Sequence, residues 1–143
     1  LDVSDEEQMV RETTAPEEPV IDPVFTGEEV CAIQRLVREV PVSDNVVSYA
    51  VRVVSRTRPD CPDAPAFVRE NVKWGAGSRA SQSLILAGKA RALLEGRCNV
   101  ACEDVRALAA PVLRHRVITN FHADAEGLTS EDIIRDLLEQ TPE

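Results

Sequence analysis

Apolar residues recur every three to four positions along much of the chain, which is the spacing of amphipathic helices. Thr26 and Glu29 stand three positions apart, as in a capping box, and predict a helix that runs from there to about Glu39 with one apolar stripe. Ser43 is the N-cap of a second predicted helix, which ends before Pro59. Its many valines disfavour an isolated helix, so we expect tertiary burial to stabilise it.

The third predicted helix is the longest and spans about residues 78–95. Leu84, Ala87 and Leu94 are expected to form its inner face, because they recur with helical spacing. Gly96 follows as the expected C-cap, since glycine adopts the left-handed conformation that ends many helices.

Helical patterns also cover residues 103–113 and 129–139. Between the helices, residues 67–74 have the composition of a short strand, and residues 117–121 form a second candidate strand that would pair with it. The expected fold class is therefore mainly all-α: a bundle of four or five helices with at most one short β-hairpin.

The N-terminal segment differs from the rest of the chain in charge. Residues 4–12 predict a short helix that begins with acids, and prolines punctuate an extended linker over 14–25. Residues 1–29 hold ten acids and one base, whereas residues 30–143 hold fifteen of each. The net charge of −9 therefore belongs to this acidic segment and not to the helical domain.

The middle of the domain is moderately basic, because residues 43–116 carry twelve bases against seven acids. Such a surface can face phosphate groups, although an ordinary solvated surface can have the same composition. The sequence contains no lysine-rich tract and no array of base-stacking aromatic residues, so we expect no nucleic acid partner.

The cysteines and histidines are too scattered for a zinc motif, which needs close pairs of ligands. Three residues separate Cys98 from Cys102, no second pair of this kind exists, and His115 and His122 are too far apart to complete a finger. We therefore expect no metal site. The sequence given has no signal peptide and no long apolar run, so we expect no membrane span and a cytoplasmic protein with reduced thiols.

Residues 75–80 match the G-x-G-x-x-A pattern of dinucleotide-binding turns, and Glu95 stands near the position of a ribose-binding acid. A Rossmann unit, however, needs a second parallel strand that ends at this acid. Glu95 instead lies at the end of a predicted helix, so we regard the match as weak.

The same glycine turn could instead help to bind an anion. Gly75, Gly77 and Ser78 lead into a helix whose first backbone N–H groups and positive dipole end attract anions. Arg79 adds a planar fork of donors that suits phosphate oxygens. An arginine at a helix start is commonly only a solvated surface residue, and that alternative remains open at this point.

The strings G-A-G-S-R-A-S at 75–81 and A-R-A-L-L-E-G-R at 90–97 resemble the G-A-S-P-R-A-S helix and the A-x-A-x-x-x-G-R ending of the MoxR family of AAA+ ATPases. Downstream, V-A-C-E-D-V at 100–105, L-R-H-R at 113–116 and A-D-A-E-G at 123–127 resemble further strings of that family. Upstream, the segment from Val40 to Thr57 resembles its V-x-V-x-D-x-V-x-x-Y helix, whose pattern ends in T-R. The resemblance covers about residues 28–139, with the strings in the same order.

This resemblance implies the helical lid domain of an AAA+ ATPase that assembles as a hexamer and has chaperone-like activity, often with partners that carry von Willebrand A domains. In this family the lid packs over nucleotide bound to the core domain of the same chain and supplies the sensor-2 arginine, which contacts the γ-phosphate. Arg79 matches that arginine, and Gly75, Gly77 and Ser78 would form the loop beside the phosphate.

The resemblance also implies a division of the chain. Residues 1–25 would hold the end of the last core strand, Leu1 to Val3, followed by the acidic linker, and residues 26–143 would be the lid. ATP and Mg²⁺ would bind the full-length parent. The 143 residues contain no G-x-x-x-x-G-K-[ST] loop, so we expect this chain alone to bind nucleotide only weakly and not to hydrolyse ATP, whereas the parent does.

Two departures from the family pattern affect local geometry. Gly77-Ser78 replaces Ser-Pro, which removes a proline suited to the first helical position. Ala101-Cys102 replaces Thr-Pro, which removes a side-chain cap from the fourth predicted helix. A free-standing helical module that binds a protein partner and no nucleotide is the alternative function, and a helical DNA-binding module is disfavoured by the charge.

Overall fold

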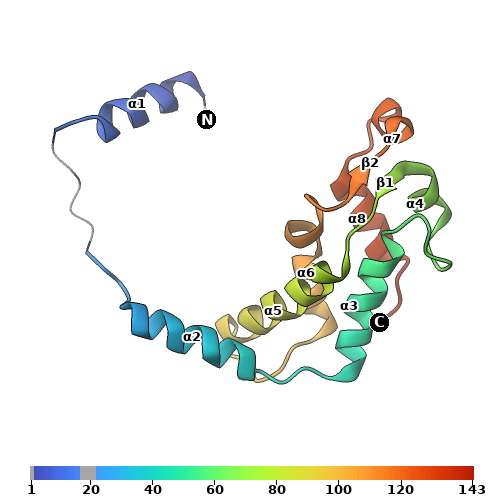
Figure 1. Cartoon of the computed structure of the whole chain (residues 1–143), viewed down its shortest axis with the longest axis horizontal. Helices are drawn as coiled ribbons and strands as arrows, with labels where there is room; N and C mark the ends of the chain where they lie inside the picture. The colour runs from blue at the N-terminus through green and yellow to red at the C-terminus, as the bar shows by residue number, and fades with distance from the viewer. Residues whose placement is uncertain (1, 17–21) are drawn as a thin grey trace. The chain divides into compact units, whose positions relative to one another are not determined.

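The computed structural model describes residues 2–16 and 22–143, which form eight helices and two short strands (Figure 1). In chain order these elements are α1 (Val3–Thr13), α2 (Gly27–Glu39), α3 (Asp44–Arg56), α4 (Ala66–Asn71), β1 (Val72–Trp74), α5 (Ser78–Leu94), α6 (Cys102–Leu113), β2 (Ile118–Thr119), α7 (Phe121–Glu126) and α8 (Ser130–Glu139). Contacts within the chain separate two units, Leu1–Ala32 and Ile33–Glu143.

The first unit contains α1 and the start of α2. Asp2 is the N-cap of α1, with its side chain accepting from Asp5 N at 2.9 Å, and the helix buries no residue. The predicted short helix is therefore confirmed. Val3, expected at the end of a strand, is instead the first residue of α1, and Leu1 lies outside the described residues. The linker expected over 14–25 also lies partly outside them; its described residues hold neither helix nor strand.

The capping box expected at the start of α2 is confirmed. Glu29 Oε2 accepts from Thr26 N at 2.7 Å, and Thr26 Oγ1 accepts from Glu29 N at 3.2 Å. The apolar stripe of the helix remains at the surface, with Ile33 45% and Leu36 52% exposed.

In the second unit, α5 packs against α3 and α6, and α8 packs against α6 (Figure 1). The valine-rich α3 has its inner face in the core, where Tyr49, Ala50, Val53 and Val54 are completely buried. Tertiary burial thus stabilises a helix of low intrinsic propensity, as the sequence predicts. Val47, by contrast, is 37% exposed and lies outside this core.

The inner face of α5 differs from the expected one. Leu94 is 89% exposed, whereas the buried residues recur at every fourth position: Ala80, Leu84, Gly88 and Ala92. A side chain at Gly88 would meet Val100 Cγ1 at 3.0 Å, so the glycine permits close approach of the segment that leads into α6. Leu84 is buried as predicted, but the other three residues of this face are small, so leucine positions alone do not define it.

The predicted mainly helical class is confirmed, and so is the pairing of two short strands. β1 pairs antiparallel with β2, with Val72 opposite Thr119. The strand expected over 67–74 is wrong in its first part, because Ala66–Asn71 is the helix α4. Short apolar runs fit one helical turn as well as a strand, and here the two buried residues of α4, Val68 and Asn71, stand three positions apart, which is helical spacing. The strands do not form a local hairpin, since α5 and α6 lie between them in the chain.

Candidate functional site

The loop Gly75–Gly77 joins β1 to α5, and both neighbouring elements hold it in place. β1 is paired with β2 on one side, and α5 begins at Ser78 on the other. Ala76, in the middle of the loop, is only 1% exposed and belongs to the hydrophobic core. The loop is therefore anchored at its centre, while Gly77, Ser78 and Arg79 are exposed.

The N-terminus of α5 has no side-chain cap. Gly77 is the N-cap in an extended conformation (φ −82°, ψ 175°), and no side chain among the described residues caps the first turn through a hydrogen bond. Ala80 N donates to Gly77 O at 2.9 Å, which leaves the N–H groups of Ser78 and Arg79 at the open end of the helix. An uncapped helix start with exposed N–H groups favours an external anion.

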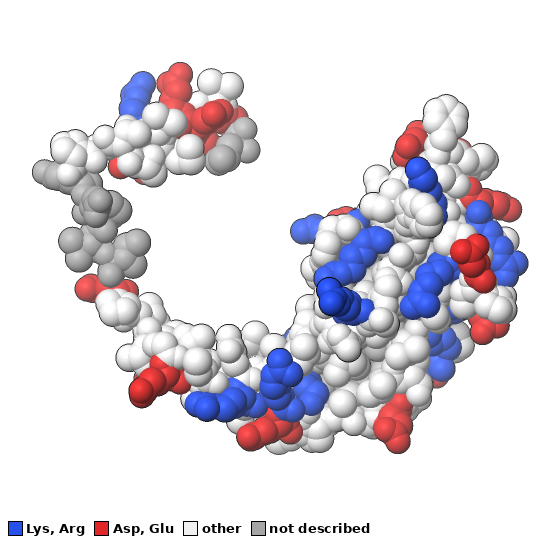
Figure 2. All heavy atoms as spheres, viewed as in Figure 1, with Lys and Arg blue, Asp and Glu red and all other residues white. Residues whose placement is uncertain are grey.

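Arg79 lies in the first turn of this helix with an exposed side chain. Within the described parts of the chain, the only hydrogen bond between Arg79 and a side chain is made by its backbone carbonyl, which accepts from Ser83 Oγ at 2.9 Å. Arg58 and Lys73, also exposed, contribute further positive charge from the neighbouring segments. Figure 2 shows basic side chains gathered on one face of this unit, over the region of α3, β1 and α5.

Two residues without a recognisable functional signal in the sequence, Thr57 and Arg58, hold this loop. Thr57, completely buried at the end of α3, accepts from Ala76 N through Oγ1 at 2.9 Å. Arg58 Nε donates to Ala76 O at 2.9 Å. The string T-R carries both residues and is part of the family resemblance, but the sequence alone assigns them no role because the contact joins segments about twenty residues apart.

The dinucleotide-binding alternative is wrong for the described residues. The turn at 75–80 follows a strand of a two-stranded antiparallel sheet, and no parallel strand accompanies it within residues 2–16 and 22–143. Glu95 is the C-cap of α5 and forms ion pairs with Arg91 at 2.9 Å and Arg97 at 2.7 Å. Its carboxylate is thus occupied by neighbouring arginines.

The C-terminal end of α5 carries a second cluster of charges. Asp104 of α6 is completely buried and accepts from both terminal nitrogens of Arg97, with Nη1 at 2.9 Å from Oδ2. It also accepts from Arg91 Nη1 at 3.3 Å and from Ala101 N at 2.9 Å. The Arg97 guanidinium, above all, holds the pKa of Asp104 below its ordinary value. Since these groups satisfy one another, the cluster is a structural clamp.

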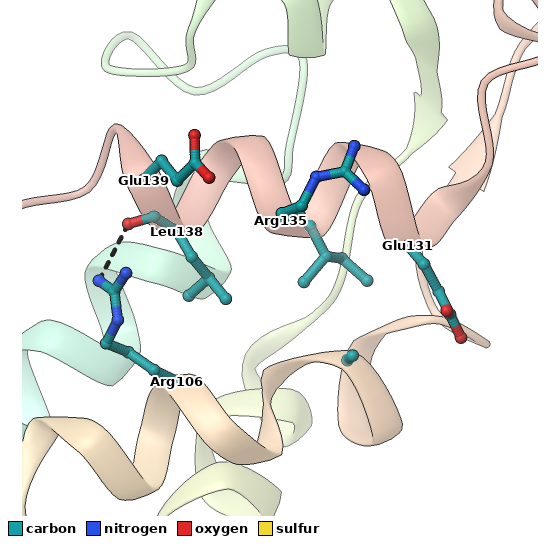
Figure 3. Close-up of a pocket in the computed structure, with 7 residues that line it drawn as sticks. Arg106, Glu131, Arg135, Leu138 and Glu139 are labelled. Atoms are coloured by element: carbon teal, nitrogen blue, oxygen red, sulfur yellow. Dashed lines mark hydrogen bonds between the residues drawn. The ribbon is translucent and has the colours of Figure 1, made fainter.

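A groove of about 360 Å³ lies between α6 and α8 (Figure 3). Arg106 Nη1 donates to Leu138 O at 3.1 Å, and Arg135 Nη2 lies 2.8 Å from Asp132 Oδ1. Two glutamates also line the groove. Its cations already have partners and are balanced by acids, so it does not offer excess positive charge to a nucleotide.

In the part of the chain that the structure describes, no cluster of three histidine, cysteine or acidic side chains is arranged to hold a metal ion. Every helix described there is too short or too polar to cross a bilayer.

Comparison with known proteins places this geometry in a family. Residues 65–137 match the model of the AAA lid domain, which includes β1, the Gly75–Gly77 loop and all of α5. A solved structure from Cytophaga hutchinsonii, described as a "putative ATPase", shares 26% identity over 99% of this chain and 43% of its own, with a TM-score of 0.80.

Two curated relatives agree with this match. An uncharacterized protein of Bacillus subtilis, YeaC, is 31% identical over 82% of this chain and 34% of its own length. Chaperone MoxR1 of Mycobacterium tuberculosis is 31% identical over 85% of this chain and 32% of its own length. The chain thus spans about a third of the length of these relatives. It belongs to the AAA lid domain family, as the lid of a MoxR-family AAA+ ATPase.

Proposed function

We propose that this chain is the nucleotide-sensing lid of a longer ATPase. In that full-length protein, Arg79 would contact the γ-phosphate of ATP bound to the core domain. The observation that carries this proposal is the exposed Arg79 guanidinium at the uncapped start of α5, free of a carboxylate among the described residues. Gly75, Gly77 and Ser78 form the loop beside that phosphate.

Electrostatics supports an external anion at this place. A cation in the first turn of a helix is disfavoured by about 0.3–1 kcal/mol, because it faces the positive end of the helix dipole. A phosphate oxygen would reverse this balance, since it attracts both the guanidinium and the free N–H groups of the first turn.

The chain supplies only part of a nucleotide site. Arg79 and the start of α5 suit the terminal phosphate, but the sequence lacks a phosphate-cradling loop, and we assign no Mg²⁺ ligand to this chain. ATP and Mg²⁺ would bind in the full-length parent, and hydrolysis would be the parent's activity.

The wider function follows from the family resemblance and from the similarity to a protein named as a chaperone. We propose a hexameric ATPase that remodels client proteins, with the adjoining core domain and neighbouring subunits as partners and von Willebrand A domain proteins as further candidates. We also propose a cytoplasmic setting, in which the thiols of the four cysteines would stay reduced.

The direct test is Arg79→Ala in the full-length ATPase. Steady-state turnover should fall strongly, toward the roughly 10³-fold that arginines on a transferred phosphoryl group contribute at the lower end. Arg79→Lys should restore only part of it, because an ammonium group lacks the planar fork. Arg114→Ala, which removes another exposed arginine, is the matched control. Unchanged turnover of Arg79→Ala in a folded protein contradicts the proposal.

A second test uses the chain by itself. One arginine and one helix start provide few contacts, so ATP should bind in about the millimolar range or not at all, which corresponds to about −4 kcal/mol or less favourable. Micromolar binding by calorimetry would contradict a site divided between core and lid.

The alternative function, a free-standing helical module that binds a protein partner, is favoured by one surface. A groove of about 610 Å³ lies between α3 and α5, where Val51 is 49% and Leu86 38% exposed. The coding sequence upstream separates the two functions: a phosphate loop in the same reading frame supports the lid, and its absence supports the free-standing module.

A further inference from the structure

Thr57 and Arg58, at the C-terminal end of α3, hold both backbone groups of a single residue in the loop before Arg79. The buried Thr57 Oγ1 donates to Val54 O at 2.6 Å and accepts from Ala76 N at 2.9 Å, so the hydroxyl acts as both donor and acceptor. Arg58 Nε donates to Ala76 O at 2.9 Å. Ala76 is therefore fixed to α3 through its N–H and its carbonyl.

Gly75 extends the same contact by close backbone approach. A Cβ atom at this position would lie 2.4 Å from Thr57 O and 2.6 Å from Arg58 Cα, far inside any allowed contact. Because those atoms belong to the backbone, no side chain could move aside to make room. The glycine is thus required so that the loop can lie directly on the end of α3.

We propose that Thr57 and Arg58 are positioning residues that fix the loop Gly75–Gly77 on α3 and thereby set the position of the Arg79 guanidinium against the nucleotide phosphate. This inference rests on the proposed sensing role of Arg79. Ala76 precedes Arg79 by three residues, and α5 begins between them, so a shift at Ala76 displaces the whole first turn. A misplacement of about 1 Å at a reacting group can lower a rate by roughly 10²-fold.

The hydroxyl of Thr57 can be tested at nearly constant volume in the full-length ATPase. Thr57→Val removes the acceptor for Ala76 N, and we expect turnover at saturating ATP to fall about tenfold, within the loss that misplacement allows. Thr57→Ser keeps the hydroxyl and should restore turnover. If Thr57 contributed only to stability, Thr57→Ser and Thr57→Val with equal unfolding temperatures would have equal turnover.

Thr141→Val is the matched control. Thr141 is also a buried threonine at the end of a helix: its hydroxyl donates to Leu137 O at 2.6 Å and accepts from Arg56 Nη1 at 2.8 Å. Neither of these hydrogen bonds involves the Gly75–Gly77 loop. We expect this variant to lose stability as Thr57→Val does and to keep its turnover, corrected for the folded fraction.

Arg58→Ala provides a second test that does not disturb the core, because Arg58 is exposed. Turnover should fall several-fold, and Arg58→Lys should not restore it, since lysine has no nitrogen at the Nε position. Arg69→Ala is its control, because Arg69 is also exposed and donates to a loop carbonyl, that of Pro62, at 2.7 Å.

The outcomes separate the two proposals. Normal turnover in Arg58→Ala and in folded Thr57→Val, with low turnover in Arg79→Ala, overturns the positioning role and leaves the sensing role in place. Normal turnover in Arg79→Ala overturns both. If Thr57→Val does not fold, Arg58→Ala and its control decide.

Discussion

The two ends of α5 both carry arginines, but the charges have opposite surroundings. At the C-terminal end, Arg91 and Arg97 converge on the buried Asp104, on the side where the helix dipole favours cations. At the N-terminal end, Arg79 is exposed on the side where the dipole disfavours a cation, and no carboxylate in the described residues compensates it. Arg91 and Arg97 therefore stabilise the fold, whereas Arg79 is available to a ligand.

The backbone at the two ends differs in the same way. Beyond the C-terminus, Gly96 takes the left-handed conformation (φ 69°), with Arg97 N donating to Ala92 O at 2.8 Å and Gly96 N donating to Leu93 O at 3.0 Å. This is a Schellman motif, and it satisfies the last carbonyls of the helix. The start of α5 lacks an equivalent cap. One end is therefore closed by the protein itself, and the other remains open to an anion.

The largest expected effect on stability comes from removing the Asp104 carboxylate at the C-terminal end of α5. Asp104→Ala leaves two arginines without their shared carboxylate and Ala101 N without its acceptor. We expect the free energy of unfolding to fall by about 2–4 kcal/mol, less than for a fully buried pair because the arginines are partly exposed. Chemical denaturation of this chain measures it. Asp136→Ala, at an exposed pair, should change stability by less than about 0.5 kcal/mol; equal losses would contradict the clamp.

The sequence identified the open end better than the closed one. The residues from Gly75 to Arg79 are contiguous, so one string predicts a glycine turn, a helix start and an arginine together. The clamp joins Arg91, Arg97 and Asp104, which come together only because the chain reverses between α5 and α6. Helical spacing assigns Asp104 merely to the start of a helix and gives no sign of its burial.

Sequence spacing does not reveal contacts between distant segments, and this also explains the other differences between prediction and structure. Ala101 offers no side-chain cap, as expected, but Asp104 reaches back to Ala101 N and supplies half of a capping box. The spacing predicts Leu94 inside, whereas α5 buries Leu84 together with the small residues Ala80, Gly88 and Ala92, which allow close packing. Contacts between distant segments, such as Thr57 with Ala76, cannot be derived from local spacing.

A second prediction compares equivalent substitutions at the two ends of α5. Arg97→Ala removes two charge-assisted hydrogen bonds to a buried carboxylate and should lower the free energy of unfolding, by less than Asp104→Ala does. Arg79→Ala should leave it unchanged within about 0.5 kcal/mol. Parallel urea titrations of this chain provide the measurement. A large loss for Arg79→Ala would show that Arg79 stabilises the fold, and the functional interpretation of the open end would fail.

A third prediction concerns pH. Asp104 has a folded-state pKa below the ordinary 3.8, first because Arg97 hydrogen-bonds its charged form. Such a group contributes stability that is fully present above the unfolded-state value and is lost as pH falls through the folded-state pKa. Stability should therefore decrease on acidification below about pH 3.8, by less than the loss in Asp104→Ala, because a protonated carboxyl keeps some hydrogen bonds.

Other acids titrate in the same range, so Asp104→Asn serves as the reference for this measurement. The asparagine cannot change charge, and the stability of this variant should depend less on pH below about 3.8. Identical pH profiles for the two proteins would show that Asp104 does not contribute through its charge.

The smallest expected effect comes from closing the open end. Gly77→Ser introduces an N-cap hydroxyl, and a Cβ atom at Gly77 meets nothing within 4 Å. Serine at an N-cap exceeds glycine by only a few tenths of a kcal/mol, so the gain in unfolding free energy should be of that size. The hydroxyl would also take up one of the N–H groups proposed to face phosphate. Turnover of the full-length ATPase should therefore fall slightly while the lid becomes more stable. A stability gain without any change in turnover would show that Arg79, and not the helix terminus, carries the attraction for the anion.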